Sequence, residues 1–396
     1  MRTRTLELNR IGPFRGTRSI PWKALSGASV ALLSCTTAPR FPAPAAHAGE
    51  HPSAATEPEV ARAPGATSAP PEPVATPVPE TPATPVPETP ATPPPRFPPP
   101  DLTPPSPRSA AAGDGRYTPF GDRTLGERSA TDPPLVVKTV LHPHPKSRFV
   151  TVTIAAIDLS RVRVRLVAGT DDLAWAKLPV DGDAGKVPAV DRDGLVLVTN
   201  GGFQPKHGHR GLVASRVVVS PPRGDGCTIL LGEDGDVKMG PFPELGSAVN
   251  SAPSLRETPP CLVAHGALHP SLLAGRDAAW AGHASDLSTR RRSALGLDRS
   301  GGTLFYAVGE EADPRWLAEA LRLAGADVAA ELDINWYWTR FLLVGDAGGT
   351  LRPTTSLIPK MEHLPTEYVA KASIRDFFYV VRREPSSAGA RVKGTP

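Results

Sequence analysis

Three short segments place glycines and polar side chains where a buried core does not require them. They are Asn200-Gly201-Gly202-Phe203, Arg290-Arg291-Arg292-Ser293-Ala294-Leu295-Gly296 and Glu331-Leu332-Asp333-Ile334-Asn335-Trp336. Between them they offer an amide, a guanidinium and carboxylates, which can orient a hydroxyl, clamp an anion and act as base or nucleophile. A Gly-x-Ser-x-Gly elbow, a Walker loop and a His-Glu-x-x-His motif are all missing, so those chemistries are not indicated.

The first segment follows an apolar run at residues 195–199. Gly201 and Gly202 permit positive φ and close approach of a ligand to the backbone, and their N–H groups can form an anion-binding nest beside Asn200. The alternative is an ordinary tight turn.

Two histidines, His207 and His209, come shortly after this turn. His207 is a candidate proton donor or metal ligand, but two imidazoles without an obvious third ligand do not define a metal site. We therefore expect neither a metal nor a cofactor.

The second segment carries three consecutive arginines. If it is a strand, Arg292, Ala294 and Gly296 share one face, and an arginine among small neighbours can present a bidentate clamp to a phosphate. The alternative is a solvated charge run at the start of a strand.

The third segment alternates polar and apolar residues. Period two would put Glu331, Asp333 and Asn335 on one face of a strand, next to the aromatic run that begins at Trp336. Such an arrangement is typical of a sugar-binding floor, with Asp333 and Glu331 as catalytic candidates; the alternative is a polar edge that faces solvent.

The elements that must position these segments are mostly strands. Apolar or alternating runs predict strands at residues 149–154, 162–167, 195–199, 213–219, 228–231, 304–308, 328–332, 341–344 and 377–381. One helix is well marked, because Asp313 is a suitable N-cap, Pro314 suits the first helical position and Gly325 suits the stop. We therefore expect an α+β domain: a strand-rich mixed sheet with few helices and one strand–helix–strand unit in the C-terminal half.

The N-terminal third has a different character. A basic stretch and a short apolar run lead to Leu32-Leu33-Ser34-Cys35, which resembles a bacterial lipobox with Cys35 as the lipidated residue; the alternative is ordinary signal cleavage near residues 46–48. Most of the 48 prolines follow, including an exact repeat of Ala75–Pro82 at Ala83–Pro90, which predicts an extended polyproline stalk. We expect residues 1–35 to be a signal and lipoprotein segment, 36–131 a disordered stalk, 132–385 the folded domain and 386–396 a disordered tail. The protein would then be exported and anchored to the bacterial cell envelope.

Charge and cysteine content narrow the partners further. The net charge of +4 comes largely from the N-terminal tail, and the remainder shows no basic stripe, so nucleic acid is not an expected partner. Cys227 and Cys261 lie in the folded part and form either a disulfide, as an oxidising compartment would allow, or two buried free thiols. The sequence does not indicate an oligomeric state.

In their order and spacing the three segments resemble the phosphodiester glycosidase family. That family shows an Asn-Gly-Gly-Phe turn, an Arg-x-Ala-x-Gly strand, a helix that ends in Gly-Ala and a Leu-Asp strand end, matched here by residues 200–203, 292–296, 325–326 and 332–333. The family usually continues Leu-Asp-Gly-Gly-Gly-Ser, whereas this chain continues Leu332-Asp333-Ile334-Asn335-Trp336-Tyr337 and later has an Arg375-Asp376-Phe377-Phe378 ending. It therefore looks like a divergent branch.

The resemblance implies a hydrolase that cleaves a sugar–phosphate diester in a glycan or envelope substrate. Asp333 would be the nucleophile or base, assisted by Glu331 or His207. The substrate would be bound by Arg292, Asn200, Asn335 and the Gly201–Gly202 amides. The alternative is a non-catalytic glycan- or wall-binding module on the same fold, which the bulky residues after Asp333 favour.

Overall fold

Antiparallel pairing organises the folded part of the chain. The computed structural model describes residues 97–121, 125, 133–276, 278–281, 290–334 and 336–383, all within the unit Val86–Pro396. In these residues the named strands form three sheets, and every pair of neighbouring strands is antiparallel. The expectation of a strand-rich domain with few helices is confirmed. The expected mixed sheet is wrong, because no two of these named strands that are hydrogen-bonded to each other run in the same direction.

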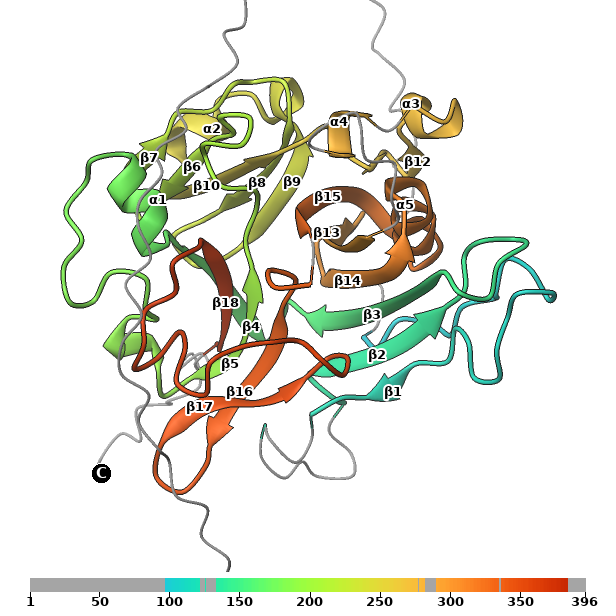
Figure 1. Ribbon diagram of the computed structural model, residues 1–396, viewed down its shortest axis with the longest axis horizontal. Coiled ribbons are helices and arrows are strands. Elements are labelled where there is room, and N and C mark those ends of the chain that lie inside the picture. The colour runs from blue at the N-terminus through green and yellow to red at the C-terminus, as the bar shows by residue number, and fades with distance from the viewer. Residues whose placement is uncertain are drawn as a thin grey trace, which may run out of the picture. The chain divides into compact units, whose positions relative to one another are not determined.

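The largest sheet has eight strands in the order β1-β2-β3-β14-β13-β15-β11-β12 (Figure 1). Their bounds are β1 Thr118–Pro119, β2 Val136–Leu141, β3 Thr151–Asp158, β11 Val263–Ala264, β12 Ala267–Leu268, β13 Arg290–Asp298, β14 Thr303–Ala312 and β15 Ala326–Ile334. The strand β1 falls inside the region assigned to the stalk. Because β1 pairs with β2 and Phe120 belongs to the core, the folded part begins before residue 132, and that boundary is corrected.

The second sheet has the order β7-β6-β10-β8-β9, and the third has the order β17-β16-β5-β18-β4. Their bounds are β4 Val162–Val167, β5 Leu195–Asn200, β6 Leu212–Ala214, β7 Val217–Ser220, β8 Cys227–Leu231, β9 Val237–Pro241, β10 Ser254–Thr258, β16 Phe341–Asp346, β17 Leu351–Ser356 and β18 Phe377–Arg382. Apolar residues from all three sheets meet in one core, for example Ile157, Leu197 and Ile229. This shared core holds the ends of strands from different sheets in fixed register with one another.

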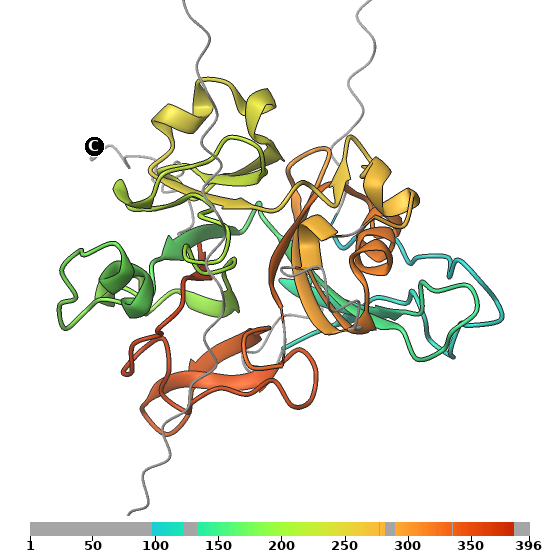
Figure 2. The ribbon, with the colours of Figure 1, turned by 45° about the horizontal axis from the view of Figure 1, so that its top comes forward.

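The helices are short. Their bounds are α1 Thr170–Trp175, α2 Ala248–Ser251, α3 Pro270–Leu273, α4 Ala278–Ala281 and α5 Pro314–Leu323, with 3₁₀ turns at Ala189–Asp191 and Phe242–Leu245. In both ribbon views α5 lies against β13, β14 and β15 (Figures 1 and 2). No helix among the described residues is long and apolar enough to cross a membrane.

Helix α5 begins and ends where the sequence predicts. The Asp313 side chain accepts a hydrogen bond from the Trp316 N–H at 3.0 Å, and Gly325 follows the last turn with φ +98°. Leu317 and Leu321 are fully buried in a second apolar cluster between the helix and the large sheet. The helix connects β14 to β15, so the expected strand–helix–strand unit is present, with β13 lying between its two strands.

A disulfide joins Cys227 to Cys261. Cys227 is the first residue of β8 in the second sheet, and Cys261 lies just before β11 in the large sheet. Of the two alternatives left open by the sequence, the structure therefore has the bridge, which ties these two sheets together covalently.

Candidate functional site

The turn Asn200-Gly201-Gly202-Phe203 leaves the end of β5 and packs against Asp376, which immediately precedes β18. The Gly201 N–H donates to the Asp376 carbonyl at 2.9 Å, and the Gly202 N–H donates to its Oδ2 at 3.0 Å. A Cβ at Gly201 would come within 2.0 Å of that Oδ2. The two glycines therefore admit Asp376 of the chain itself, whose carbonyl and carboxylate oxygens accept from the two N–H groups that were expected to hold a phosphate.

Asn200 is buried, and its side chain forms hydrogen bonds to several strands. Its Nδ2 donates to the Gly201 carbonyl at 2.9 Å and to Ser293 Oγ at 3.0 Å. Its Oδ1 accepts from Tyr306 OH at 2.9 Å and from the Arg340 N–H at 2.9 Å. Both amide hydrogens and both acceptor positions are thus engaged, so Asn200 orients β5, β13 and β14 relative to one another.

Asp333 lies next to the hydrogen bonds of Asn200, near the end of β15. Its N–H donates to the Gly201 carbonyl at 3.0 Å, and its carbonyl accepts from Ser293 Oγ at 2.8 Å. Its carboxylate pairs with Arg375 and accepts from the Ile334 N–H at 2.9 Å. Burial raises the pKa of Asp333 to about 7, even though the guanidinium of Arg375 favours the charged form. The structure thus brings Asn200, Gly201 and Asp333 together.

A β-bulge separates Glu331 from Asp333. Arg292 lies opposite Ile334, whereas Ala294 lies opposite Glu331, so β15 contains one residue more than β13 across this interval. A bulge redirects the side chains that follow it. The prediction that period two puts Glu331 and Asp333 on one face is therefore wrong.

Arg292 lies on the far side of the large sheet from Asp333. Its Nη1 donates to Glu331 Oε1 at 2.8 Å and to the Trp280 carbonyl at 3.0 Å, on the face that α5 covers. Its side chain is 3% exposed. Arg292 and Glu331 therefore form a buried pair, and the phosphate clamp that we expected from Arg292 does not reach the turn at Asn200.

The space around Asp333 is almost filled. The lining residues leave a cavity of about 10 Å³, enough for roughly one water molecule. Those residues are Asn200, Gly201, Asp333, Trp338, Arg340, Tyr368, Ser373, Arg375 and Asp376. The Trp338 ring centroid lies 4.6 Å from Arg375 Cζ and 5.8 Å from Arg340 Cζ. Trp338, which lies five residues after Asp333, thus helps to close the space beside the carboxylate.

Beyond Asp376 the polar network continues through residues that sequence analysis did not single out. Arg256 donates from Nε to Asp376 Oδ2 at 2.7 Å, and the Asp376 N–H donates to Asp172 Oδ2 at 2.8 Å. Burial, reinforced by Asp376, raises the pKa of Asp172 to about 7. The sequence carries one signal for this network, because Asp376 directly precedes the apolar run of β18.

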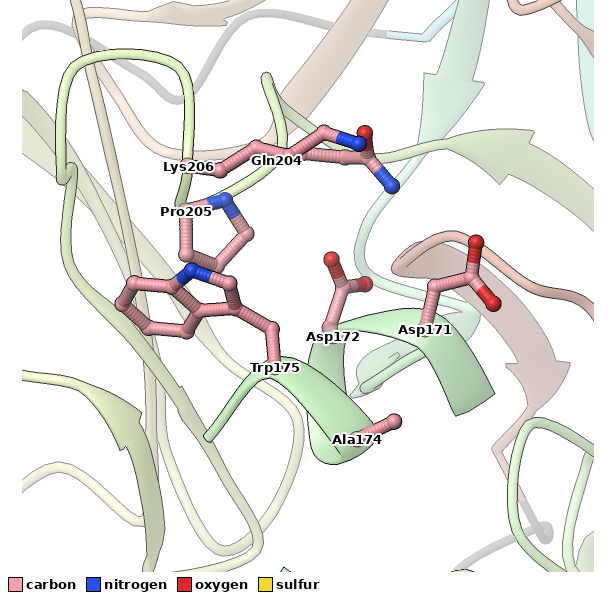
Figure 3. A pocket seen from close by; sticks show the side chains of 7 residues that line it. All are labelled: Asp171, Asp172, Ala174, Trp175, Gln204, Pro205 and Lys206. Carbon is pink, nitrogen blue, oxygen red and sulfur yellow. The ribbon is translucent and has the colours of Figure 1, made fainter. Parts of the chain in front are cut away.

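Asp172 also lines a pocket of about 250 Å³, which opens between α1 and the turn that follows Phe203. Figure 3 shows its lining residues: Asp171, Asp172, Ala174, Trp175, Gln204, Pro205 and Lys206. This pocket is much larger than the cavity at Asp333. An open pocket and a closed cavity thus flank the same residue, Asp376, which contacts Asp172 and lines the cavity.

Two predicted site residues remain. His207 is exposed on the turn at residues 205–208 and is not among the residues that line either space. Asn335 lies outside the described residues. Within the part of the chain that the structure describes, no group of three or more His, Cys, Asp or Glu side chains is arranged to hold a metal ion.

No family model and no curated protein matches this chain. Among solved structures it is similar to the catalytic domain of zebrafish N-acetylglucosamine-1-phosphodiester α-N-acetylglucosaminidase auto-inhibited by its pro-peptide. That pair has 14% identity and a TM-score of 0.40, and covers 66% of this chain and 87% of the other. A hypothetical protein from Synechocystis has 13% identity and a TM-score of 0.36, and the match covers 64% of this chain and 65% of the other. A Burkholderia pseudomallei protein described as a putative exported protein has 11% identity and a TM-score of 0.35, and the match covers 59% of this chain and 74% of the other. At these TM-scores the likeness does not carry an argument about activity.

Proposed function

We propose that the domain hydrolyses a sugar–phosphate diester and that Asp333 is the group that activates the attacking water. One observation carries the proposal: the Asp333 carboxyl, with a pKa raised to about 7, lies beside a guanidinium at the Asn-Gly-Gly turn. A general base is most effective when its pKa is close to the working pH. The resemblance of the three segments to phosphodiester glycosidases supports the same reaction.

The residues suggest how the step would proceed. Asp333 would take a proton from water as the water oxygen attacks the anomeric carbon and the bond from that carbon to the phosphate oxygen breaks. A phosphate monoester leaves without strong protonation, so a second carboxylic acid is less necessary than in ordinary glycoside hydrolysis. Arg375, instead of the expected Arg292, would stabilise the charge on the departing phosphate. Turnover requires that Trp338 move away from Arg375, because its ring covers the carboxylate.

The cellular setting is part of the proposal. A lipid on Cys35 and a proline-rich stalk would hold the domain in the cell envelope, where glycans that carry phosphodiesters occur. The Cys227–Cys261 disulfide supports export, since disulfides persist mainly in oxidising compartments.

The test is an assay on a synthetic alkyl diester of N-acetylglucosamine 1-phosphate, followed by release of the free sugar. We expect Asp333→Asn to lower kcat by at least 100-fold, because general-base catalysis contributes about 10²–10⁴-fold. Asp183→Asn is the matched control, since the Asp183 side chain is 92% exposed and pairs only with Lys186 among its described ionic partners. Equal turnover by wild type and Asp333→Asn would remove Asp333 from this role.

A second function, a non-catalytic glycan-binding module, is favoured by the closure of the cavity. Trp338 and Tyr368 leave about 10 Å³ beside Asp333, and the hydrogen-bonding groups of Asn200 are all engaged. Binding of wall polysaccharide without release of any sugar, in wild type and in Trp338→Ala alike, would identify the domain as such a module.

A further inference from the structure

The pocket beside α1 is built from two segments that are close only in the fold. Asp171, Asp172 and Trp175 come from the helix, whereas Gln204 and Lys206 come from the turn that follows the Asn-Gly-Gly-Phe segment. Figure 3 shows the Asp172 carboxylate directed from the helix toward the Gln204 and Lys206 side chains, with the Trp175 indole beside Pro205. The pocket therefore gathers an acid, an amide, an ammonium group and an aromatic face around one space.

Asp172 supplies the second observation. Its side chain is 1% exposed, and its Oδ2 accepts from the Gly169 N–H at 3.2 Å and the Asp376 N–H at 2.8 Å. Its Oδ1 has no hydrogen-bond partner among the described residues. A buried polar atom that lines a pocket without a partner costs free energy, which a ligand hydroxyl could recover.

The remaining lining residues fit a phosphorylated sugar. Trp175 is 40% exposed, and an exposed indole face binds the apolar face of a sugar ring. The Gln204 amide can both donate to and accept from a hydroxyl, and the exposed Lys206 ammonium can pair with a phosphate. The lining is thus polar at one side and aromatic at the other, which suits a sugar ring, and Lys206 is the one cation among the lining residues that can meet a phosphate.

We propose that this pocket binds the sugar-phosphate end of a glycan, with Asp172 Oδ1 hydrogen-bonded to a ring hydroxyl, Trp175 against the ring and Lys206 on the phosphate. The inference rests on the proposed function, because it names the binding subsite for the substrate class proposed above. Asp376 connects the two places, since its N–H donates to Asp172 while its side chain reaches the Gly202 N–H beside the cavity of Asp333.

The experiment measures binding of N-acetylglucosamine 1-phosphate to the full chain by calorimetry, with inorganic phosphate and free N-acetylglucosamine as separate arms. We expect Trp175→Ala to weaken binding at least tenfold and Asp172→Asn to weaken it several-fold. Lys206→Ala should weaken binding of the sugar phosphate but not of the free sugar. The matched control is Phe149→Ala, because Phe149 is an aromatic residue that is 85% exposed and lies outside the lining of the pocket.

Folding is checked separately by the urea midpoint of each variant. Trp175→Ala, whose residue is half exposed, is expected to fold even if Asp172→Asn does not. The subsite is refuted if wild type fails to bind at millimolar ligand, if Trp175→Ala binds as tightly as wild type, or if Phe149→Ala loses as much affinity as Trp175→Ala.

The two proposals fail in different ways. Diester turnover that depends on Asp333 but is unaffected by Trp175→Ala would refute the subsite and leave the hydrolase proposal intact. Binding that is lost in Trp175→Ala, in a protein that releases no sugar from the diester, would establish the subsite and refute the hydrolase.

Discussion

Arg256 offers the sharpest test of how the candidate site is held together. Its side chain is fully buried, and its Nε donates to Asp376 Oδ2 at 2.7 Å. Its Nη1 donates to the carbonyls of Gly211 at 3.1 Å and Glu257 at 2.9 Å. Arg256→Met would leave a buried carboxylate without its cation and several carbonyls without a donor.

The expected loss can be estimated from these contacts. Removing one partner of a buried ion pair costs about 3–5 kcal/mol, because the remaining charge is uncompensated. Since the free energy of unfolding of a domain is about 5–15 kcal/mol, the variant should lose a large part of its stability. The double variant Arg256→Met/Asp376→Asn should lose less than the sum of the two single changes, since it no longer buries the stranded charge.

The assay is urea unfolding of the oxidised protein, followed by circular dichroism. Arg299→Met is the matched control, because Arg299 is 82% exposed and its pair with Asp327 at 3.1 Å should contribute about 0–1 kcal/mol. If Arg256→Met and Arg299→Met unfolded at the same urea concentration, or if the double variant showed strict additivity, the buried pair would not hold the site together as described.

Three further changes test other parts of the structure. Burial raises the pKa of Asp172 and Asp333 from 3.8 to about 7, so the protonated carboxyl groups favour the folded state. Their contribution to the free energy of unfolding is complete below about pH 4 and is lost as the pH rises to about 7. The urea midpoint of wild type should therefore fall more over this range than that of the Asp172→Asn/Asp333→Asn variant, and parallel curves would contradict the assignment. Gly201→Ala should destabilise the fold by about 1–3 kcal/mol, because the added Cβ would clash with Asp376. The control Gly182→Ala, with nothing within 4 Å of its added Cβ, should be near neutral. Similar urea midpoints for the two variants would argue against the close approach of Asp376 to Gly201. Cys35→Ser should abolish incorporation of labelled palmitate in a bacterial host, and retained label would exclude Cys35 as the lipidation site.

Local signals were enough to predict several elements. Helix α5 follows from Asp313, Pro314 and Gly325, and β4 follows from the alternation of valines and arginines that the structure shows as alternating burial. The run at residues 213–219 was predicted as one strand but forms the hairpin of β6 and β7. Its turn residues, Ser215 and Arg216, adopt φ of 48° and 67° without the Asn-Gly or Asp-Gly pair that usually marks such a turn.

The geometry of the site depends on contacts that no local pattern encodes. The bulge in β15 arises from pairing with β13, so the alternation of Glu331 and Asp333 could not reveal that they diverge. Asn200 was identified by its position after an apolar strand, but its saturation by Ser293, Tyr306 and Arg340 depends on three distant segments. Residue types indicated where polar groups gather, and tertiary pairing decided which of them meet.

The bridge between Cys227 and Cys261 determines what a single proteolytic cut would do to the protein. A protease that nicks the chain once between residues 228 and 260 would produce two fragments that stay covalently joined through the bridge. Because the bridge spans the cut, the strands on either side of it could not diffuse apart. Damage of this kind would become visible only after reduction, when the two pieces separate.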